Sequence, residues 1–571
     1  MSNWARTYEK GLPGSLVSVS SAHLIGLALV AFLAFFYNLN HSFLEGSEGL
    51  YAGITRELVR SHQLLELTYQ GEPYFNKPPL FFWLLALSTS LFGENEVAFR
   101  LPGALFCLGT MALTYALGMI LFSRTAAFWA ALVVATSHVF LWYGPRVLFD
   151  SALTFFITLA LLGWVQASLR GATPWWYVLS FLAMALGGMI KELHGFALPA
   201  LLILAYAAVQ RDFRMIRQPL FWIGLMTSLA LVTAYAWMLA RGFQSHFQIG
   251  AGLQSMFSLW DLKAFIGARS IFWYLSIMWF DFFPWCALIP SSLVLLFARR
   301  PLRNHPAELF VLLWVLGFFL VFSLAQVKRE PYLMPIVPGL GLMIGYFFDR
   351  VFASAEERAW ATPLFKVTLG SLAVAYVLAM LVGPSLLQRR WHIPETVFPT
   401  EFVAVVLSIC AVLLYALARS GARAALMTLG VLGVTLVVGV VHFVIPAIDQ
   451  VASPKKMVAE VTALSAHAPG PVLLYAPGWP RNEDAVYYLK QVPVVQGVDS
   501  EEALVGAVSG NGPVMVITEE QQLRRLKQRT DLSVDLLREF QQPRRKNLLL
   551  LSVRKLERPI TWEDCQRFSP R

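Results

Sequence analysis

Three acidic side chains of this sequence stand where apolar segments begin or end, which is an unusual place for a charge. Glu45 and Glu48 follow the first apolar run, and Asp150 begins a later one. A carboxylate in such a position can act as a general base on an acceptor hydroxyl or amine, or it can hold a metal ion. The simpler roles are a solvated carboxylate for each glutamate and a helix N-cap for Asp150.

Basic side chains gather at the ends of other apolar segments. A single cation there is most often an anchor at the membrane surface. Several that converge on one cavity fit a phosphorylated ligand, because a leaving phosphate needs positive charge beside it. Arg146, four residues before Asp150, could pair with that carboxylate or bind the phosphate. The candidate ligands of the anion are Lys77, Arg146, Lys191, His194, Lys328, Arg329 and Tyr332. An anionic ligand that lives in a membrane suggests a polyprenyl-phosphate sugar.

A metal site is left open by the sequence. His246 could ligate a divalent ion together with a carboxylate, although a lone histidine is usually not a ligand. The chain has four cysteines, at positions 107, 286, 410 and 565. Three of them fall in apolar runs and one in the tail, so they indicate neither a disulfide framework nor a thiolate metal site.

Composition identifies the elements that must position these groups. The chain has 571 residues, of which 57% are hydrophobic and 14% charged, and its mean hydropathy is +0.59. A soluble protein carries about a quarter charged residues. Repeated apolar runs of roughly 17 to 25 residues can each cross a bilayer core of about 30 Å. We therefore expect an α-helical polytopic membrane protein. Its net charge of +10 lies largely in short loops at the ends of these runs, which does not indicate a nucleic-acid partner.

The apolar runs predict about thirteen transmembrane helices. They lie at residues 22–39, 100–121, 125–142, 151–169, 175–190, 194–209, 219–240, 271–298, 307–327, 333–349, 364–386, 402–419 and 424–445. The stretch 79–93 is ambiguous. If it dips into the surface without crossing, arginine-rich loops face the cytoplasm, as the positive-inside rule requires. A fourteen-span arrangement also satisfies those arginines, but it leaves Arg6 and Lys10 outside. With thirteen spans, the long first loop (41–99) and the candidate site residues share the outer face.

The composition changes after Pro446. Residues 447–571 contain strand-like runs that alternate with amphipathic helical stretches such as 500–508 and 519–529, a pattern typical of a small α/β domain. An odd number of spans places this domain outside the cytoplasm. We therefore expect a transmembrane domain over residues 1–446 and a periplasmic α/β domain over 447–571, the latter without a catalytic motif.

Several motifs together resemble those of the C-type glycosyltransferases. The similarity is to the bacterial branch that contains lipid A aminoarabinose transferases and relatives of protein mannosyltransferases. The matching motifs, in their order and spacing, extend over most of residues 20–350. The segments that carry the resemblance are 48–52, 56–58, 71–80, 92–93, 100–102, 146–154, 190–191, 283–285 and 328–335.

The resemblance implies an enzyme of the bacterial inner membrane whose active site and C-terminal domain are periplasmic. Such enzymes move a sugar from an undecaprenyl-phosphate-linked donor, with inversion, to lipid A, another envelope glycan or protein. Lys77 and Tyr332 would hold the lipid phosphate. The family often has aspartate where this chain has Ser47, so Glu48 is the first choice of base and Glu45 the second. It often has glutamate where this chain has Asn76, which weakens the case for a metal ion.

Two other functions use the same features. A flippase or transporter of lipid-linked sugars would also need an outer cavity, and a non-catalytic family member would only bind the donor. Transporters often carry internal repeats with broken helices at the membrane midplane. This sequence has no evident repeat and its ionisable residues gather at span ends, both of which favour the enzyme.

Replacing Glu48 by Gln, or Lys77 by Ala, is expected to abolish sugar transfer. The first change removes the base and the second removes a cation from the leaving phosphate. The measurement is transfer from a polyprenyl-phosphate sugar by membranes that contain equal amounts of each variant. Full activity in both variants would contradict these assignments.

Overall fold

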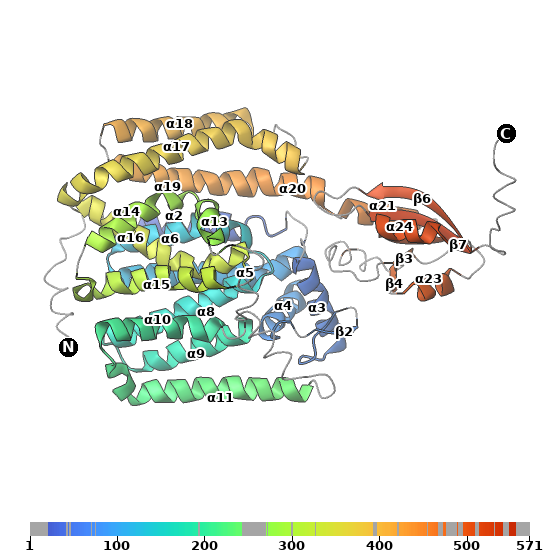
Figure 1. The fold of residues 1–571 in the computed structure, drawn as a ribbon, viewed down its shortest axis with the longest axis horizontal. Helices are drawn as coiled ribbons and strands as arrows, with labels where there is room; N and C mark the ends of the chain where they lie inside the picture. Colours follow the sequence, from blue (N-terminus) through green and yellow to red (C-terminus); the bar gives the residue numbers. More distant parts are fainter. Residues whose placement is uncertain are drawn as a thin grey trace. The chain divides into compact units, whose positions relative to one another are not determined.

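The computed structural model describes most of the chain, and its elements fall into two compact units (Figure 1). One unit comprises residues 1–40, 54–384 and 398–444, and the other comprises 41–53, 385–397 and 445–571. The described residues are 21–40, 44, 47–69, 71–74, 76–191, 194–242, 270, 272–298, 301–325, 327–353, 355–391, 397–419, 422–453, 455–465, 472–475, 488, 495–498, 500–508, 513–529, 531–540 and 548–555.

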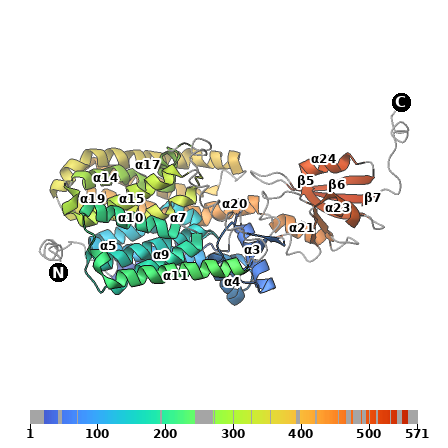
Figure 2. The ribbon, with the colours of Figure 1, turned by 60° about the horizontal axis from the view of Figure 1, so that its bottom comes forward.

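The first unit is a bundle of apolar helices. Its long elements are α2 (Ser21–Phe35), α5 (Glu96–Leu121), α6 (Arg124–Thr136), α8 (Phe149–Trp164), α9 (Trp175–Lys191), α10 (His194–Gln210), α11 (Pro219–Gly242), α15 (Pro306–Leu324), α16 (Val337–Ala353), α17 (Ala355–Trp391), α18 (Thr400–Ala418) and α19 (Ala422–Val438). Figure 2 shows α9 and α11 side by side in this bundle. Within the described residues, seven helices are long and apolar enough to cross a membrane, or up to nine if each bent pair is one span. The protein is therefore a multi-pass membrane protein, and the number thirteen stays a prediction.

A seam of small residues lets α6 and α16 approach closely. A Cβ atom added at Gly345 would lie 2.2 Å from the carbonyl oxygen of Ala126, and one at Gly341 would lie 2.7 Å from that of Ala130. The two contacts repeat every four residues on both helices, as is typical of closely packed membrane helices. This seam fixes α16 and the segment that precedes it, η6 (Glu330–Ile336).

The first loop folds into short elements. Helix α3 (Ser47–Ser61) is amphipathic and is followed by a hairpin of β1 (Thr68–Tyr69) and β2 (Glu72–Pro73). Glu57 on α3 accepts hydrogen bonds from the Thr68 hydroxyl, at 2.8 Å, and from the backbone N–H of Gly71, at 3.3 Å. The ambiguous stretch forms α4 (Leu80–Phe92). At 1.5 Å per residue these 13 residues span about 20 Å, less than a bilayer core of about 30 Å.

The structure breaks the span that the sequence predicts over residues 271–298. Helix α13 (Trp273–Asp281) ends before Pro284, a single turn η4 (Trp285–Leu288) follows, and α14 (Ile289–Ala298) leaves at an angle of 114°. Pro284 has no N–H to continue the helical hydrogen bonds. The sequence predicted a span here but not its bend, because an apolar run does not reveal a bend. The run 125–142 is likewise divided, at Ser137, into α6 and α7 (His138–Tyr143).

The second unit contains a five-stranded mixed sheet of order β4-β3-β5-β7-β6. Strands β3 (Val472–Tyr475), β4 (Val495–Val498) and β5 (Val514–Glu519) run parallel, while β6 (Leu532–Phe540) and β7 (Leu548–Lys555) complete it antiparallel. Alternate residues of β3 face opposite sides. Leu473 belongs to a core shared with α23 (Glu501–Ala507) and α24 (Glu520–Lys527), and Leu474 to one shared with α21 (Lys455–Ser465). The sequence did not predict β6.

Replacing Gly345 by Val is expected to lower stability by about 1–3 kcal/mol, because the new side chain would overpack the α6–α16 seam. Gly317→Val on α15 is the matched control, since a Cβ at Gly317 has no neighbour within 4 Å. The measurement is the thermal unfolding midpoint of each purified variant in the same detergent. Equal midpoints for the two variants would contradict the role of the seam.

Candidate functional site

Asp150, Lys191 and Tyr332 lie on three separate elements and meet in the helical unit. The ammonium nitrogen of Lys191 lies 2.6 Å from Oδ1 of Asp150 and 3.9 Å from the centre of the Tyr332 ring. The exposed fractions of Asp150 and Lys191 are only 5% and 7%. A carboxylate and the negative face of an aromatic ring both attract a cation. The lysine is thus held in a fixed position at the end of α9.

Packing around this cluster explains why its residues meet. Phe149, which precedes Asp150, packs against Phe81 and Phe82 of α4, with ring centroids 4.7 and 5.5 Å away. Ser180 on α9 donates a hydrogen bond of 2.8 Å to the carbonyl of Ala160 on α8. These contacts hold the beginning of α8 beside α4 and fasten α9 along α8.

The turn after Lys191 is equally close-packed. A Cβ added at Gly187 would lie 3.1 Å from the Cα of Gly195, so α9 and α10 approach with no room for side chains. His194, at the beginning of α10, has its Nδ1 atom 3.3 Å from the carbonyl oxygen of Lys191. The predicted ligand His194 therefore lies at the same helix end as Lys191, where it contacts the backbone.

Lys328 and Arg329 directly precede η6, which carries Tyr332. Tyr274, which is fully buried, donates a 3.0 Å hydrogen bond to the carbonyl of Arg329 and accepts one of 3.2 Å from its N–H. Lys328 is buried and donates to the carbonyl of Ala325. Burial lowers the pKa of the Lys328 ammonium group from its ordinary value. Arg329 itself is exposed.

Two residues of a second polar group, Tyr143 and Asp281, were missed by the sequence reasoning. The Tyr143 hydroxyl donates to the Glu330 carboxylate, and Asp281 at the end of α13 is fully buried, with neither carboxylate oxygen bonded among the described residues. Arg146 lies over the ring of Trp142, with Cζ 4.6 Å from its centre. The carboxylate of Asp150 pairs with Lys191 instead of Arg146. A charge inside the apolar run 273–285 was a signal for Asp281, because intramembrane ionisable residues are most often functional.

The structure describes two of the first-loop candidates, Glu48 and Lys77. Glu48 lies in the first turn of α3 and is buried, with 1% exposure. Lys77 is half-buried, three residues before α4 begins at Leu80. Glu45 and His246 lie outside the described residues. Glu48 belongs to the second compact unit and the other described candidates to the first.

Across the described ranges, no group of three or more His, Cys, Asp and Glu side chains is arranged to hold a metal ion. Asp150, the carboxylate best placed for such a role, is occupied by Lys191. Asn76, which is exposed, stands next to Lys77. A metal ion at this site stays a prediction that rests on residues not described.

The chain is similar to known glycosyltransferases in part of its sequence and in its fold. The family model described as dolichyl-phosphate-mannose-protein mannosyltransferase matches residues 76–237, which include Lys77, Asp150 and Lys191. ArnT from Cupriavidus metallidurans bound to undecaprenyl phosphate superposes with a TM-score of 0.73 over 93% of this chain and 98% of that one, at 20% identity. The fold is shared, and the predicted resemblance to the C-type glycosyltransferases is confirmed.

The chain is also similar in sequence to particular proteins. It is 27% identical over 362 residues to the undecaprenyl phosphate-alpha-4-amino-4-deoxy-L-arabinose arabinosyl transferase of Pseudomonas paraeruginosa, covering 61% of this chain and 64% of the relative. It is 28% identical to a transferase of the same description from Pseudomonas fluorescens, covering 61% and 65%. An uncharacterized protein of Aquifex aeolicus is 27% identical, covering 56% and 62%. These matches span less than two thirds of each relative.

Replacing Lys191 by Met is expected to destabilise the protein by about 3–5 kcal/mol, because it leaves the buried Asp150 charge without its partner. Asp150→Asn combined with Lys191→Met removes both charges and should recover most of that loss. Breaking the exposed Asp212–Arg214 pair with Arg214→Gln is the control, and should cost at most about 1 kcal/mol. The measurement is the thermal unfolding midpoint. A Lys191→Met variant as stable as Arg214→Gln would contradict a tightly coupled buried pair.

Proposed function

We propose that this protein is an integral-membrane glycosyltransferase that moves a sugar from an undecaprenyl-phosphate-linked donor to an acceptor on the periplasmic side of the inner membrane. The acceptor is lipid A, another envelope glycan or protein. The observation that carries the proposal is the buried Lys191 ammonium, held between Asp150 and Tyr332. Support comes from the family match, whose range 76–237 includes Asp150 and Lys191, and from the shared fold of ArnT, which was solved with undecaprenyl phosphate.

The proposed reaction is a direct displacement with inversion at the anomeric carbon. An acceptor oxygen or nitrogen forms the new bond to that carbon while the bond from the carbon to the lipid phosphate oxygen breaks. The electron pair of the broken bond stays on undecaprenyl phosphate, and the acceptor proton passes to a carboxylate base. Cations stabilise the charge that develops on the leaving phosphate, which is where fixed charges contribute most.

We assign different roles to the carboxylates Asp150 and Glu48, because their surroundings differ. Asp150 holds Lys191, so we assign it to positioning that cation beside the phosphate. Glu48, buried in the first turn of α3 and part of the family-like motif, is assigned as the base, with Glu45 as the alternative. Lys77, Arg329 and Tyr332 complete the phosphate site, and Arg146, His194 and Lys328 support it from the neighbouring turns.

The test is transfer of radiolabelled sugar from undecaprenyl phosphate by the purified protein in lipid nanodiscs, with envelope lipids and glycans as acceptors. The proposal expects labelled acceptor and released undecaprenyl phosphate. The Asp150→Asn/Lys191→Met variant should retain its fold and lose activity by roughly 10²-fold or more, since positioned charges of this kind contribute on that scale. Arg217→Gln, an exposed cation in the loop between α10 and α11, should leave transfer unchanged.

Each rival function predicts a different result from the same protein. Movement of the labelled donor across sealed vesicles without a labelled acceptor would indicate a flippase. Donor binding with neither transfer nor movement would indicate a non-catalytic member of the family. Either result would overturn the proposal. Mass spectrometry of envelope lipids and glycans from a deletion strain would then identify the acceptor and the sugar.

A further inference from the structure

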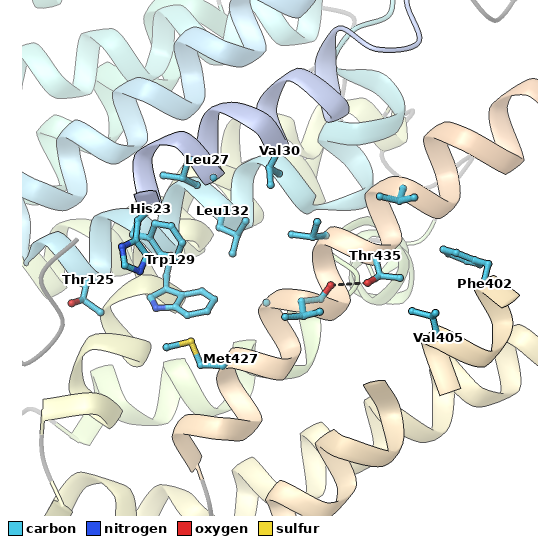
Figure 3. Close-up of a pocket in the computed structure, with 16 residues that line it drawn as sticks. His23, Leu27, Val30, Thr125, Trp129, Leu132, Phe402, Val405, Met427 and Thr435 are labelled. Carbon is cyan, nitrogen blue, oxygen red and sulfur yellow. Dashed lines mark hydrogen bonds between the residues drawn. The ribbon is translucent and has the colours of Figure 1, made fainter. Parts of the chain in front are cut away.

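An apolar groove runs along the helical unit between α2, α6, α18 and α19. Its volume is about 570 Å³. Figure 3 shows Leu27 and Val30 of α2, Leu132 of α6 and Val405 of α18 pointing into it from different helices. The Thr435 hydroxyl, which also lines it, bonds to the carbonyl of Val431 on its own helix, at 2.9 Å. The groove thus offers almost no free polar group along its length.

The groove has a buried floor and an exposed rim. Leu27, Trp129 and Leu132 form the floor, with exposed fractions of 4% to 6%. Val405 and Val431 stand on the rim and are 51% and 53% exposed. Both rim helices are long and apolar enough to cross a membrane, so the surrounding medium is hydrocarbon. A groove that opens sideways to that medium has the shape and polarity for a hydrocarbon chain.

One end of the groove is polar and lies at the start of α6, a helix that begins with an arginine. His23 and Thr125 line this end, and the His23 ring packs edge-on against Phe128 at 5.4 Å. Arg124, the first residue of α6, comes directly before Thr125 and is exposed. Arg124 makes no ion pair with any described residue. An arginine at the end of an apolar groove complements the phosphate of a lipid headgroup.

The polar end of the groove and the candidate functional site lie at opposite ends of α6. Arg124 begins this helix, while Tyr143 and Arg146 follow its last residue, Thr136. The 13 residues of α6 span about 20 Å. A donor placed for reaction has its phosphate at the candidate site, beside Lys191. The phosphate that Arg124 would bind therefore belongs to a different lipid.

We propose that this groove binds a membrane phospholipid with an anionic headgroup, one acyl chain lying over Leu27 and Leu132 and the phosphate beside Arg124 and His23. The site is structural in character and does not depend on the proposed transfer reaction. By the predicted orientation, Arg124 faces the cytoplasm, so the lipid comes from the inner leaflet. Its acyl chain fills the space that α2, α6, α18 and α19 leave between them.

The experiment uses the full chain in nanodiscs of phosphatidylethanolamine that contain a trace of phosphatidylglycerol with a diazirine on one acyl chain. After irradiation, labelled peptides are mapped by mass spectrometry. The expected result is preferential labelling of residues 23–30, 125–132 and 427–438. Val431→Trp, which fills the rim, should reduce this labelling several-fold. Leu378→Trp on α17, a leucine that is 54% exposed, is the matched control and should not reduce it.

The headgroup is tested by a second pair of variants. Arg124→Gln should weaken labelling by phosphatidylglycerol about fivefold, the equivalent of about 1 kcal/mol per cation near an anionic lipid surface. It should leave labelling by a phosphatidylcholine probe unchanged, and Arg217→Gln should affect neither probe. Thermal unfolding midpoints confirm that each variant is folded, and Met427→Trp replaces Val431→Trp if that variant is not.

Three results would overturn the proposal. The first is labelling of α17 around Leu378 as strong as that of the groove, which would mean general contact with the bilayer. The second is displacement of the probe by undecaprenyl phosphate at low concentration, which would assign the groove to a polyprenyl lipid. The third is a dimer of the chain whose formation is abolished by Val431→Trp, which would assign the groove to self-association.

Discussion

The buried ion pair between Asp150 and Lys191 is the constraint on which the helical unit depends most. Two charges removed from water are costly unless they are paired and further solvated by the protein. Here the Asp150 carboxylate bonds to Lys191, and the Tyr332 ring covers the ammonium. The pair ties the beginning of α8 to the end of α9, and the ring adds η6. Asp150, Lys191 and Tyr332 are separated by 41 and 141 residues in sequence. Their three segments must therefore pack together before the Asp150 and Lys191 charges can pair.

The sequence was sufficient to identify the residues of this cluster but not to predict their contacts. Asp150, Lys191 and Tyr332 are recognisable because each stands at the end of an apolar run, where a polar group needs a reason. Their pairing depends on how α8 packs against α9, through Gly163 and Ser180. Nothing in the local pattern encodes that packing. For this reason Arg146, the nearer cation in sequence, was considered as the partner of Asp150, whereas it lies over Trp142.

Secondary structure was predictable to a similar extent. Amphipathicity predicted the stretches 500–508 and 519–529, which form α23 and α24, and the strand-like runs predicted an α/β arrangement. The strand β6 was missed because its solvent-facing residues, such as Leu536 and Leu537, are apolar and exposed, so the alternation of the pattern is weak. The bend after Asp281 was missed because hydropathy averages over a window and registers only composition. A proline and a charge within one apolar run are the two signals that such averaging removes.

The close seam between α6 and α16 affects the position of the candidate site residues Tyr143 and Tyr332, which lie beyond the ends of these helices. Helix α16 continues directly from η6, which carries Tyr332, and α6 leads through Ser137 into α7, which carries Tyr143. Both helices are aligned by backbone contacts at Gly341 and Gly345, where no side chain can adapt. An added methyl group there would shift η6 as one rigid piece, and displacements of about 1 Å can reduce a rate by about 10²-fold. Selection on the proposed reaction would therefore act on glycines 9 and 13 residues away from Tyr332. Sequence constraint would then extend along α16, well beyond the residues that touch substrate.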